Sequence, residues 1–141
     1  MMVATLRSVG AVAAGIAVAF VLVVAVEAFS AVVHPFPEGF EGTREEVVRQ
    51  VELYPAWVLA VVLPAWGLTA FAGAWTAGRL GNRGTAAFVG VLLLAALILN
   101  IAQLPYPIWF EVGSVLAIAA AVVYAYRLSS RRAATAMQVT A

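Results

Sequence analysis

Residues 9–33 read VGAVAAGIAVAFVLVVAVEAFSAVV, an almost unbroken apolar run that contains a single charged residue, Glu27. A helix needs about 20 mostly apolar residues to cross the hydrocarbon core of a bilayer, so this run is long enough to span it. The run exceeds the roughly 7–15 apolar residues of a secretory signal peptide. We therefore expect an uncleaved first span.

The rest of the chain has the same character. Of its 141 residues, 65% are hydrophobic and 11% are charged, and the mean hydropathy is +1.01. Because soluble domains are about 25% charged, this composition excludes an ordinary soluble enzyme, and the lipid bilayer is the expected partner. Further apolar runs lie at 54–77, 85–104 and 108–126. With no alternating barrel pattern, they predict an all-α membrane protein with a four-transmembrane-helix bundle.

We predict a single transmembrane domain over residues 1–128, with an outer loop at 34–53 and a short cytoplasmic tail at 129–141. The HPFP sequence at 34–37 ends the first span, because proline fixes φ and lacks a donor. The TREE sequence at 43–46 is a capping-box pattern that opens a helix with an apolar stripe of valines. The loop therefore contains a predicted short extramembrane amphipathic helix between spans one and two.

The placement of arginine predicts the orientation. Six of the eight arginines lie before the first run, between the second and third runs, or after the fourth, whereas loop 34–53 contains two. Because arginine-rich segments stay in the cytoplasm, we expect a multi-pass protein of the inner (plasma) membrane with both termini cytoplasmic. The six arginines are Arg7, Arg79, Arg83, Arg127, Arg131 and Arg132.

Polar side chains concentrate in the outer half of the predicted bundle. Glu27 lies inside the first span, where an ionisable group costs about 3 kcal/mol unless it faces the bundle interior and finds a partner. Helical spacing places Ser30 and His34 on its face. The third span runs outward and the fourth inward, so polar residues near the loop between them lie at a depth in the bilayer similar to that of Glu27. The candidate ligand or ion site comprises Glu27, His34, Asn100, Gln103 and Glu111.

Alternatives remain open for these residues. Three readings are open for Glu27: it serves a ligand, proton or cation, it joins helices by hydrogen bonds to Asn100 or Gln103, or it is exposed to lipid or lies outside the span. His34 either interacts with the carbonyls at its helix end or, with Glu27 or Glu111, binds a metal, although no H-E-x-x-H motif is present. Small-residue stripes at 11–19 and 70–78 are expected to let helices pack closely.

Other chemistry finds no support in the sequence. The absence of cysteine excludes disulfides and thiolate sites, and no basic run indicates a nucleic-acid partner. No nucleophile elbow, P-loop or dinucleotide fingerprint is present, which favours a non-enzymatic protein without a cofactor. We expect it to bind a ligand, cation or partner in the outer half of the bundle. The alternative is a proton- or cation-coupled transporter acting as a homo-oligomer, which a polar cavity reaching Thr69 or Thr76 would favour.

Three segments carry a resemblance to other proteins. These segments are HPFP at 34–37, which follows Glu27, YPAW at 54–57 and PYPIWF at 105–110. With these segments the chain resembles a family of small, uncharacterised bacterial proteins with four transmembrane helices. The resemblance covers nearly the whole chain, and it implies the fold and the membrane but no reaction.

Overall fold

The protein is all-helical. The structure, a computed structural model, describes the backbone of residues 2–139 and the side chains of residues 3–129. The described residues contain no strand. Four of the five helices are long and apolar enough to cross a membrane. The helices are α1 (Met2–Val33), α2 (Arg44–Glu52), α3 (Ala56–Leu80), α4 (Arg83–Ile101) and α5 (Ile108–Val139).

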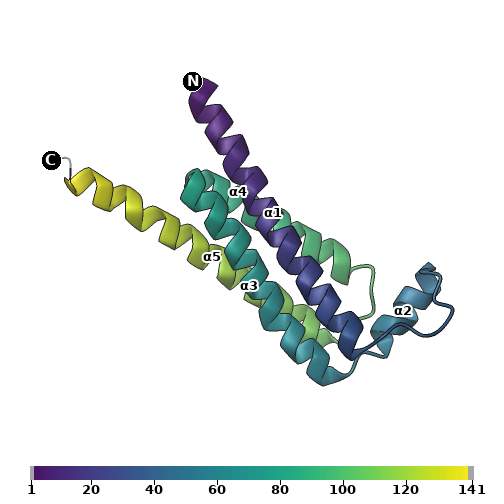
Figure 1. Ribbon diagram of the computed structural model, residues 1–141. Helices are drawn as coiled ribbons and strands as arrows, with labels where there is room; N and C mark the ends of the chain where they lie inside the picture. Colours follow the sequence, from purple (N-terminus) through teal and green to yellow (C-terminus); the bar gives the residue numbers. More distant parts are fainter. Residues whose placement is uncertain (1, 140–141) are drawn as a thin grey trace.

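The four long helices form one bundle in which α3 is central. Helix α3 packs extensively against α1, α4 and α5, whereas α1 and α4 touch much less. The two chain ends and the short turn between α3 and α4 lie at one end of the bundle, and α2 lies at the other (Figure 1). We call these the terminal end and the α2 end.

The helix bounds differ from the predicted spans at several ends. The predicted third span ends at residue 104, whereas helix α4 ends at Ile101. The residue before a proline is disfavoured in the α region, so the helix ends ahead of Pro105. Helix α5 continues to Val139, so the predicted tail at 129–141 is helical as far as that residue. The segment lacks Gly and Pro and contains several alanines, which favour helix.

A capping box opens α2, as the sequence predicts. The backbone N–H of Thr43 donates to Glu46 Oε2 over 3.0 Å, and the Glu46 N–H donates to Thr43 Oγ1 over 3.4 Å. The buried Gln50 side chain donates to the carbonyls of His34 at 3.2 Å and Pro35 at 3.3 Å. Helix α2 is thereby joined to the end of α1.

Small residues bring helices together in the half of the bundle near the termini. A Cβ atom added at Gly15 of α1 would lie 2.6 Å from the carbonyl oxygen of Gly73 in α3. The buried alanines at this contact are Ala11, Ala19 and Ala77. The expected close packing through the stripe at 11–19 is confirmed, and it occurs within one chain. The second stripe, made of Ala70, Ala74 and Gly78, instead faces α4 and α5.

Large side chains fill the half of the bundle near α2. Val58, Leu59 and Val62 of α3 are buried against Phe110 of α5, with Trp66 packed beside them. Side chains of this size hold the helices further apart than the glycines do. The α2 half therefore has room for a hollow between the helices.

Candidate functional site

A hollow of about 190 Å³ lies beside α3 in the α2 half of the bundle. All four long helices contribute to its wall, which is mostly apolar. The apolar lining consists of Val23, Trp66, Ala70, Leu93, Ala96, Leu97 and Ile118. Three polar side chains join this lining, namely Glu27 from α1, Thr69 from α3 and Asn100 from α4.

Asn100 has an unsatisfied acceptor at this hollow. Its Oδ1 atom is buried and accepts no hydrogen bond from any residue that the structure describes. A buried polar atom without a partner costs about 1–3 kcal/mol. Thr69 does not supply the missing donor, because its hydroxyl donates to the carbonyl oxygen of Ala65 over 2.9 Å. Asn100 Oδ1 therefore remains an unused acceptor in the wall of this hollow.

Glu27 lies between this hollow and a smaller one. The second hollow, of about 20 Å³, is lined by Glu27 together with the hydroxyl-bearing residues Ser30, Tyr54 and Tyr106. Trp66 lines both hollows. The carboxylate thus has an apolar hollow on one side and a cluster of three hydroxyl groups on the other.

The two tyrosines near Glu27 are held in their protonated form. Burial raises the pKa of the Tyr106 hydroxyl, and the negative charge of Glu27 raises it further. Burial also raises the pKa of Tyr54, against the lowering effect of a hydrogen bond with the Ser30 side chain. Both phenols therefore remain neutral hydrogen-bond donors at the edge of the carboxylate site.

The sequence predicts that Glu27 faces the interior of the bundle. In the single chain, however, the bundle does not enclose Glu27, and its side chain is exposed. The reason is the arrangement of α1, which packs along α3 and makes little contact with α4. The hollow consequently opens sideways between α1 and α4. An ionisable group at such an opening is costly when its surroundings are hydrocarbon.

The structure separates two of the predicted site residues from Glu27 and Asn100. Gln103 is exposed beyond the end of α4, and its amide donates to the carbonyl of Leu99 over 2.9 Å. Glu111, in the first turn of α5, lines a different apolar hollow with Val112 and Leu116. Neither residue lines the hollow that Glu27 and Asn100 share.

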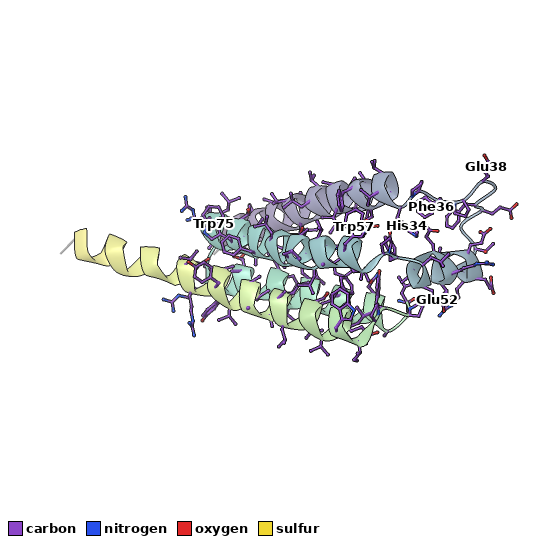
Figure 2. All side chains as sticks on the ribbon, turned by 90° about the horizontal axis from the view of Figure 1, so that it is seen from below. His34, Phe36, Glu38, Glu52, Trp57 and Trp75 are labelled. Atoms are coloured by element: carbon purple, nitrogen blue, oxygen red, sulfur yellow. The ribbon has the colours of Figure 1, made fainter. Side chains whose placement is uncertain are left out.

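His34 lies just beyond the end of α1, at the α2 end of the bundle (Figure 2). Its backbone N–H donates to the Ser30 carbonyl over 2.8 Å, and its ring lies 4.8 Å from the Tyr54 ring. Its Nε2 atom is buried and has no hydrogen-bond partner among the described residues. His34 is therefore adjacent to the site through Tyr54, without lining the larger hollow. Within the described residues, no three His, Asp or Glu side chains are grouped to hold a metal ion.

Sequence reasoning missed the aromatic part of the site. The candidate site predicted from the sequence contains none of the three aromatic residues Tyr54, Trp66 and Tyr106. The available signal was the position of each tyrosine next to a proline, in the YPAW and PYPIWF segments. Since proline restricts the backbone, a tyrosine beside it is held in a fixed position.

Comparison of the chain with protein-family models, with curated proteins and with solved structures finds no match. The chemistry of the site is therefore argued from its own residues.

Proposed function

We propose that this chain is an integral membrane protein that binds an amphiphilic ligand with a hydrogen-bond-donating head, most favourably an ammonium group. The head lies between Glu27 and Asn100, and the apolar body lies in the hollow. One observation carries the proposal, namely that a carboxylate and a buried, unpartnered carbonyl oxygen line the same apolar hollow. Because both are acceptors, the complementary head is a donor, and a cationic donor gains the charge-assisted bond to Glu27.

The membrane setting is part of the proposal. Four helices are long and apolar enough to span a bilayer, and six of the eight arginines belong to segments near the terminal end. With both termini at one end of the bundle, this bias favours a cytoplasmic terminal end in the inner (plasma) membrane (Figure 1). The α2 end then faces outward, and Glu27 lies about 10 Å below the end of α1 at ~1.5 Å per residue.

Helix α2 fits the outer surface of the bilayer in this orientation. Val47, Val48 and Val51 are buried or half-buried on one side of it, while Glu45 and Arg49 are exposed. A short helix with such a division of side chains lies along a membrane interface. We place α2 there, over the outer ends of the spans.

The sideways opening supports delivery of the ligand from the bilayer. The hollow is apolar except for its three polar residues, and it opens between α1 and α4 toward the region that lipid occupies. An amphiphile already dissolved in the outer leaflet enters laterally without crossing the bundle. Its head group then covers the Glu27 carboxylate, which lipid chains would leave unsolvated.

A proton- or cation-coupled transporter is the second candidate, and one observation favours it. The hollow extends to Thr69, near the middle of α3, although it does not reach Thr76. Beyond it, Gly15 and Gly73 bring α1 and α3 into close contact, which closes a route between these two helices. Transport would therefore require a second copy of the chain to complete the route.

A head-group series tests the binding proposal. Purified protein in lipid nanodiscs is heated with dodecylamine, dodecanol or dodecanoate, which share one chain length and differ in the head. We expect the largest rise in Tm with dodecylamine, a smaller rise with dodecanol and none with dodecanoate. A rise with dodecanoate equal to that with dodecylamine would contradict the proposal. Proton flux in proteoliposomes driven by a dodecylamine gradient would instead support the transporter.

A further inference from the structure

The smaller of the two hollows beside Glu27 has the size and the lining of a site for one water molecule. Its volume is about 20 Å³, whereas a buried water needs only about 10–15 Å³ of such space and roughly two to four polar partners. The polar partners available are Glu27 and Ser30 from α1 and the phenols of Tyr54 and Tyr106. Because hydroxyl groups both donate and accept, a water molecule there meets partners of both kinds.

The polar groups around this hollow interact with one another. Burial raises the pKa of the Tyr54 and Tyr106 phenols, and the negative charge of Glu27 raises both further. The buried Ser30 side chain is hydrogen-bonded to Tyr54. The carboxylate and the hydroxyl groups therefore converge on the hollow. A water molecule between them donates to Glu27 and accepts from a phenol, which costs little compared with a direct hydrogen bond.

His34 extends this polar cluster toward the α2 end of the bundle (Figure 2). Its ring lies 4.8 Å from the Tyr54 ring, and it follows Ser30 by one helical turn, with its backbone N–H bonded to the Ser30 carbonyl. The residue is half-buried, but its Nε2 atom is fully buried and lacks a hydrogen-bond partner among the described residues. Since an imidazole can take up a proton at one nitrogen and release one at the other, His34 is suited to carry protons inward.

The remaining surroundings of Glu27 offer protons no comparable route. The described residues of α3, α4 and α5 that line the two hollows carry no ionisable side chain, so Tyr54 and Tyr106 are the titratable groups that face Glu27. The sideways opening between α1 and α4 leads to lipid when the helices span a bilayer, and hydrocarbon does not carry protons. The polar cluster is therefore the path of least cost between Glu27 and water.

We propose that the smaller hollow binds one water molecule, and that this water, Tyr54 and His34 transfer protons between the α2 end and Glu27. A proton taken up by His34 moves inward as each oxygen along the path accepts one proton and releases another. It ends in the O–H bond of the Glu27 carboxyl group, and His34, Tyr54 and the water return to their starting forms.

This path makes ligand binding at Glu27 responsive to protons. A neutral carboxyl group loses the charge-assisted bond to a cationic head, so a proton that arrives through the smaller hollow releases a ligand from the larger one. That consequence rests on the proposed function, whereas the water site and the path do not depend on a ligand.

Infrared difference spectra of ligand-free protein in nanodiscs, taken between neutral and acidic pH, test the water site. The C=O band of protonated Glu27 is identified by its loss in Glu27→Gln, and bound water by an O–H band that shifts in heavy-oxygen water. We expect this water band in wild type and in Ser30→Ala, which leaves the space open. Ser30→Val removes the same hydroxyl but fills the hollow, so it should abolish the band.

The rate at which Glu27 is protonated tests the path. After a rapid acid jump, the C=O band of Glu27 should appear at least about tenfold more slowly in Ser30→Val than in Ser30→Ala, because a positioned proton carrier is lost. His34→Gln should slow the band similarly, and it keeps the backbone carbonyl to which Gln50 donates. An unchanged rate in His34→Gln would refute His34 as the outer end of the path.

A second variant decides the matter even if Ser30→Val does not fold. Tyr106→Phe keeps the aromatic ring beside Trp66 and removes one hydroxyl from the hollow, so it should shift the water band and slow protonation. A water band that persists in Ser30→Val, or equal protonation rates in wild type, Ser30→Val and Tyr106→Phe, would overturn the proposal. Because these measurements contain no ligand, a failure of dodecylamine to bind would refute the proposed function alone.

Discussion

The side chains of Glu27 on α1 and Asn100 on α4 line one hollow, although α1 and α4 make little direct contact. What brings them to the same hollow is α3, which packs against both helices and contributes Trp66 and Thr69 to the wall between them. The buried Asn100 Oδ1 has no partner among the described residues, and the exposed Glu27 carboxylate lies at the sideways opening. This pairing of acceptors leads to the first prediction.

Replacing Asn100 with leucine should separate ligand binding from folding. An apolar side chain removes an unsatisfied acceptor from an apolar hollow, so the free energy of unfolding should stay level or rise by about 1 kcal/mol. The stabilisation by dodecylamine should disappear, because one of the two acceptors for its head is lost. Thermal unfolding in nanodiscs, with and without dodecylamine, measures both effects.

Gln103→Leu is the matched control for this change. Gln103 is exposed and hydrogen-bonded to its own helix, so its replacement should leave the dodecylamine effect intact. If Asn100→Leu instead destabilises the protein strongly, the amide is part of an internal hydrogen-bond lock and the ligand interpretation fails.

The contact between α1 and α3 predicts an asymmetry between two glycines of α1. Gly15→Ala places a Cβ atom 2.6 Å from the Gly73 carbonyl oxygen and 2.8 Å from the Ala77 Cβ, so the helices must separate. We expect a loss of about 1–3 kcal/mol in stability. Gly10→Ala meets no atom within 4 Å and should be neutral or stabilising, since alanine favours helix. Equal effects on unfolding in micelles would show that α1 and α3 do not meet at Gly15.

The capping box of α2 predicts a dependence on pH. The hydrogen bond from the Thr43 backbone, with smaller contributions from neighbouring groups, holds the pKa of Glu46 below its ordinary value. A carboxyl group with a lowered folded-state pKa contributes stability above its unfolded pKa, and that stability is lost as the pH falls through the folded value. Amide chemical shifts should therefore report loss of the first turn of α2 on acidification below about pH 4.

Two substitutions check the source of this effect. Glu46→Gln keeps a side-chain acceptor for the Thr43 N–H but cannot titrate, so the first turn should become insensitive to pH over the same range. Glu45→Gln, one position earlier and outside the capping box, should leave the wild-type pH dependence in place. A pH response that survives Glu46→Gln would assign the transition to another carboxyl group.

The orientation predicts the result of reporter fusions. With both termini at the same end of the bundle, a reporter at residue 81 and one after residue 141 should report the same side, and the arginine bias makes that side the cytoplasm. A reporter inserted at residue 42 should report the outside. An outward C-terminus would refute the proposed orientation while leaving the helix packing unaffected.

The sequence was sufficient for the helical class and insufficient for the site, for a physical reason. Apolar runs of spanning length bounded by Pro, Gly and charges determine where helices lie, and depth along each helix follows from counting residues. Rotation of a helix about its axis depends on packing that hydropathy does not encode. Helix α5 buries Phe110 and Ser114, with Gly113 close to Leu63, and this rotation carries Glu111 away from Glu27.

Asn100 and Gln103 show the same limit on the neighbouring helix. The buried Leu97 lies one turn before Asn100 on the same face, so packing of Leu97 directs Asn100 to the hollow. Gln103 would share that face in a longer helix, but α4 ends at Ile101 and the register is lost. Tyr54 and Tyr106 stand beside prolines in the sequence. Their position near Glu27 depends on the conformation of the loops that contain them, which the sequence pattern does not give.

The most direct test of the central claim is the dissociation constant of dodecylamine, measured in lipid nanodiscs for wild type, Glu27→Gln and Glu111→Gln. Both variants remove one carboxylate from the α2 half of the bundle, but only Glu27 lines the hollow with Asn100. We predict that Glu27→Gln weakens binding at least about tenfold, the loss of one charge-assisted hydrogen bond, and that Glu111→Gln changes it less than about twofold. Unchanged affinity in Glu27→Gln, or equal losses in the two variants, would contradict the assignment of Glu27 as the ligand-binding carboxylate.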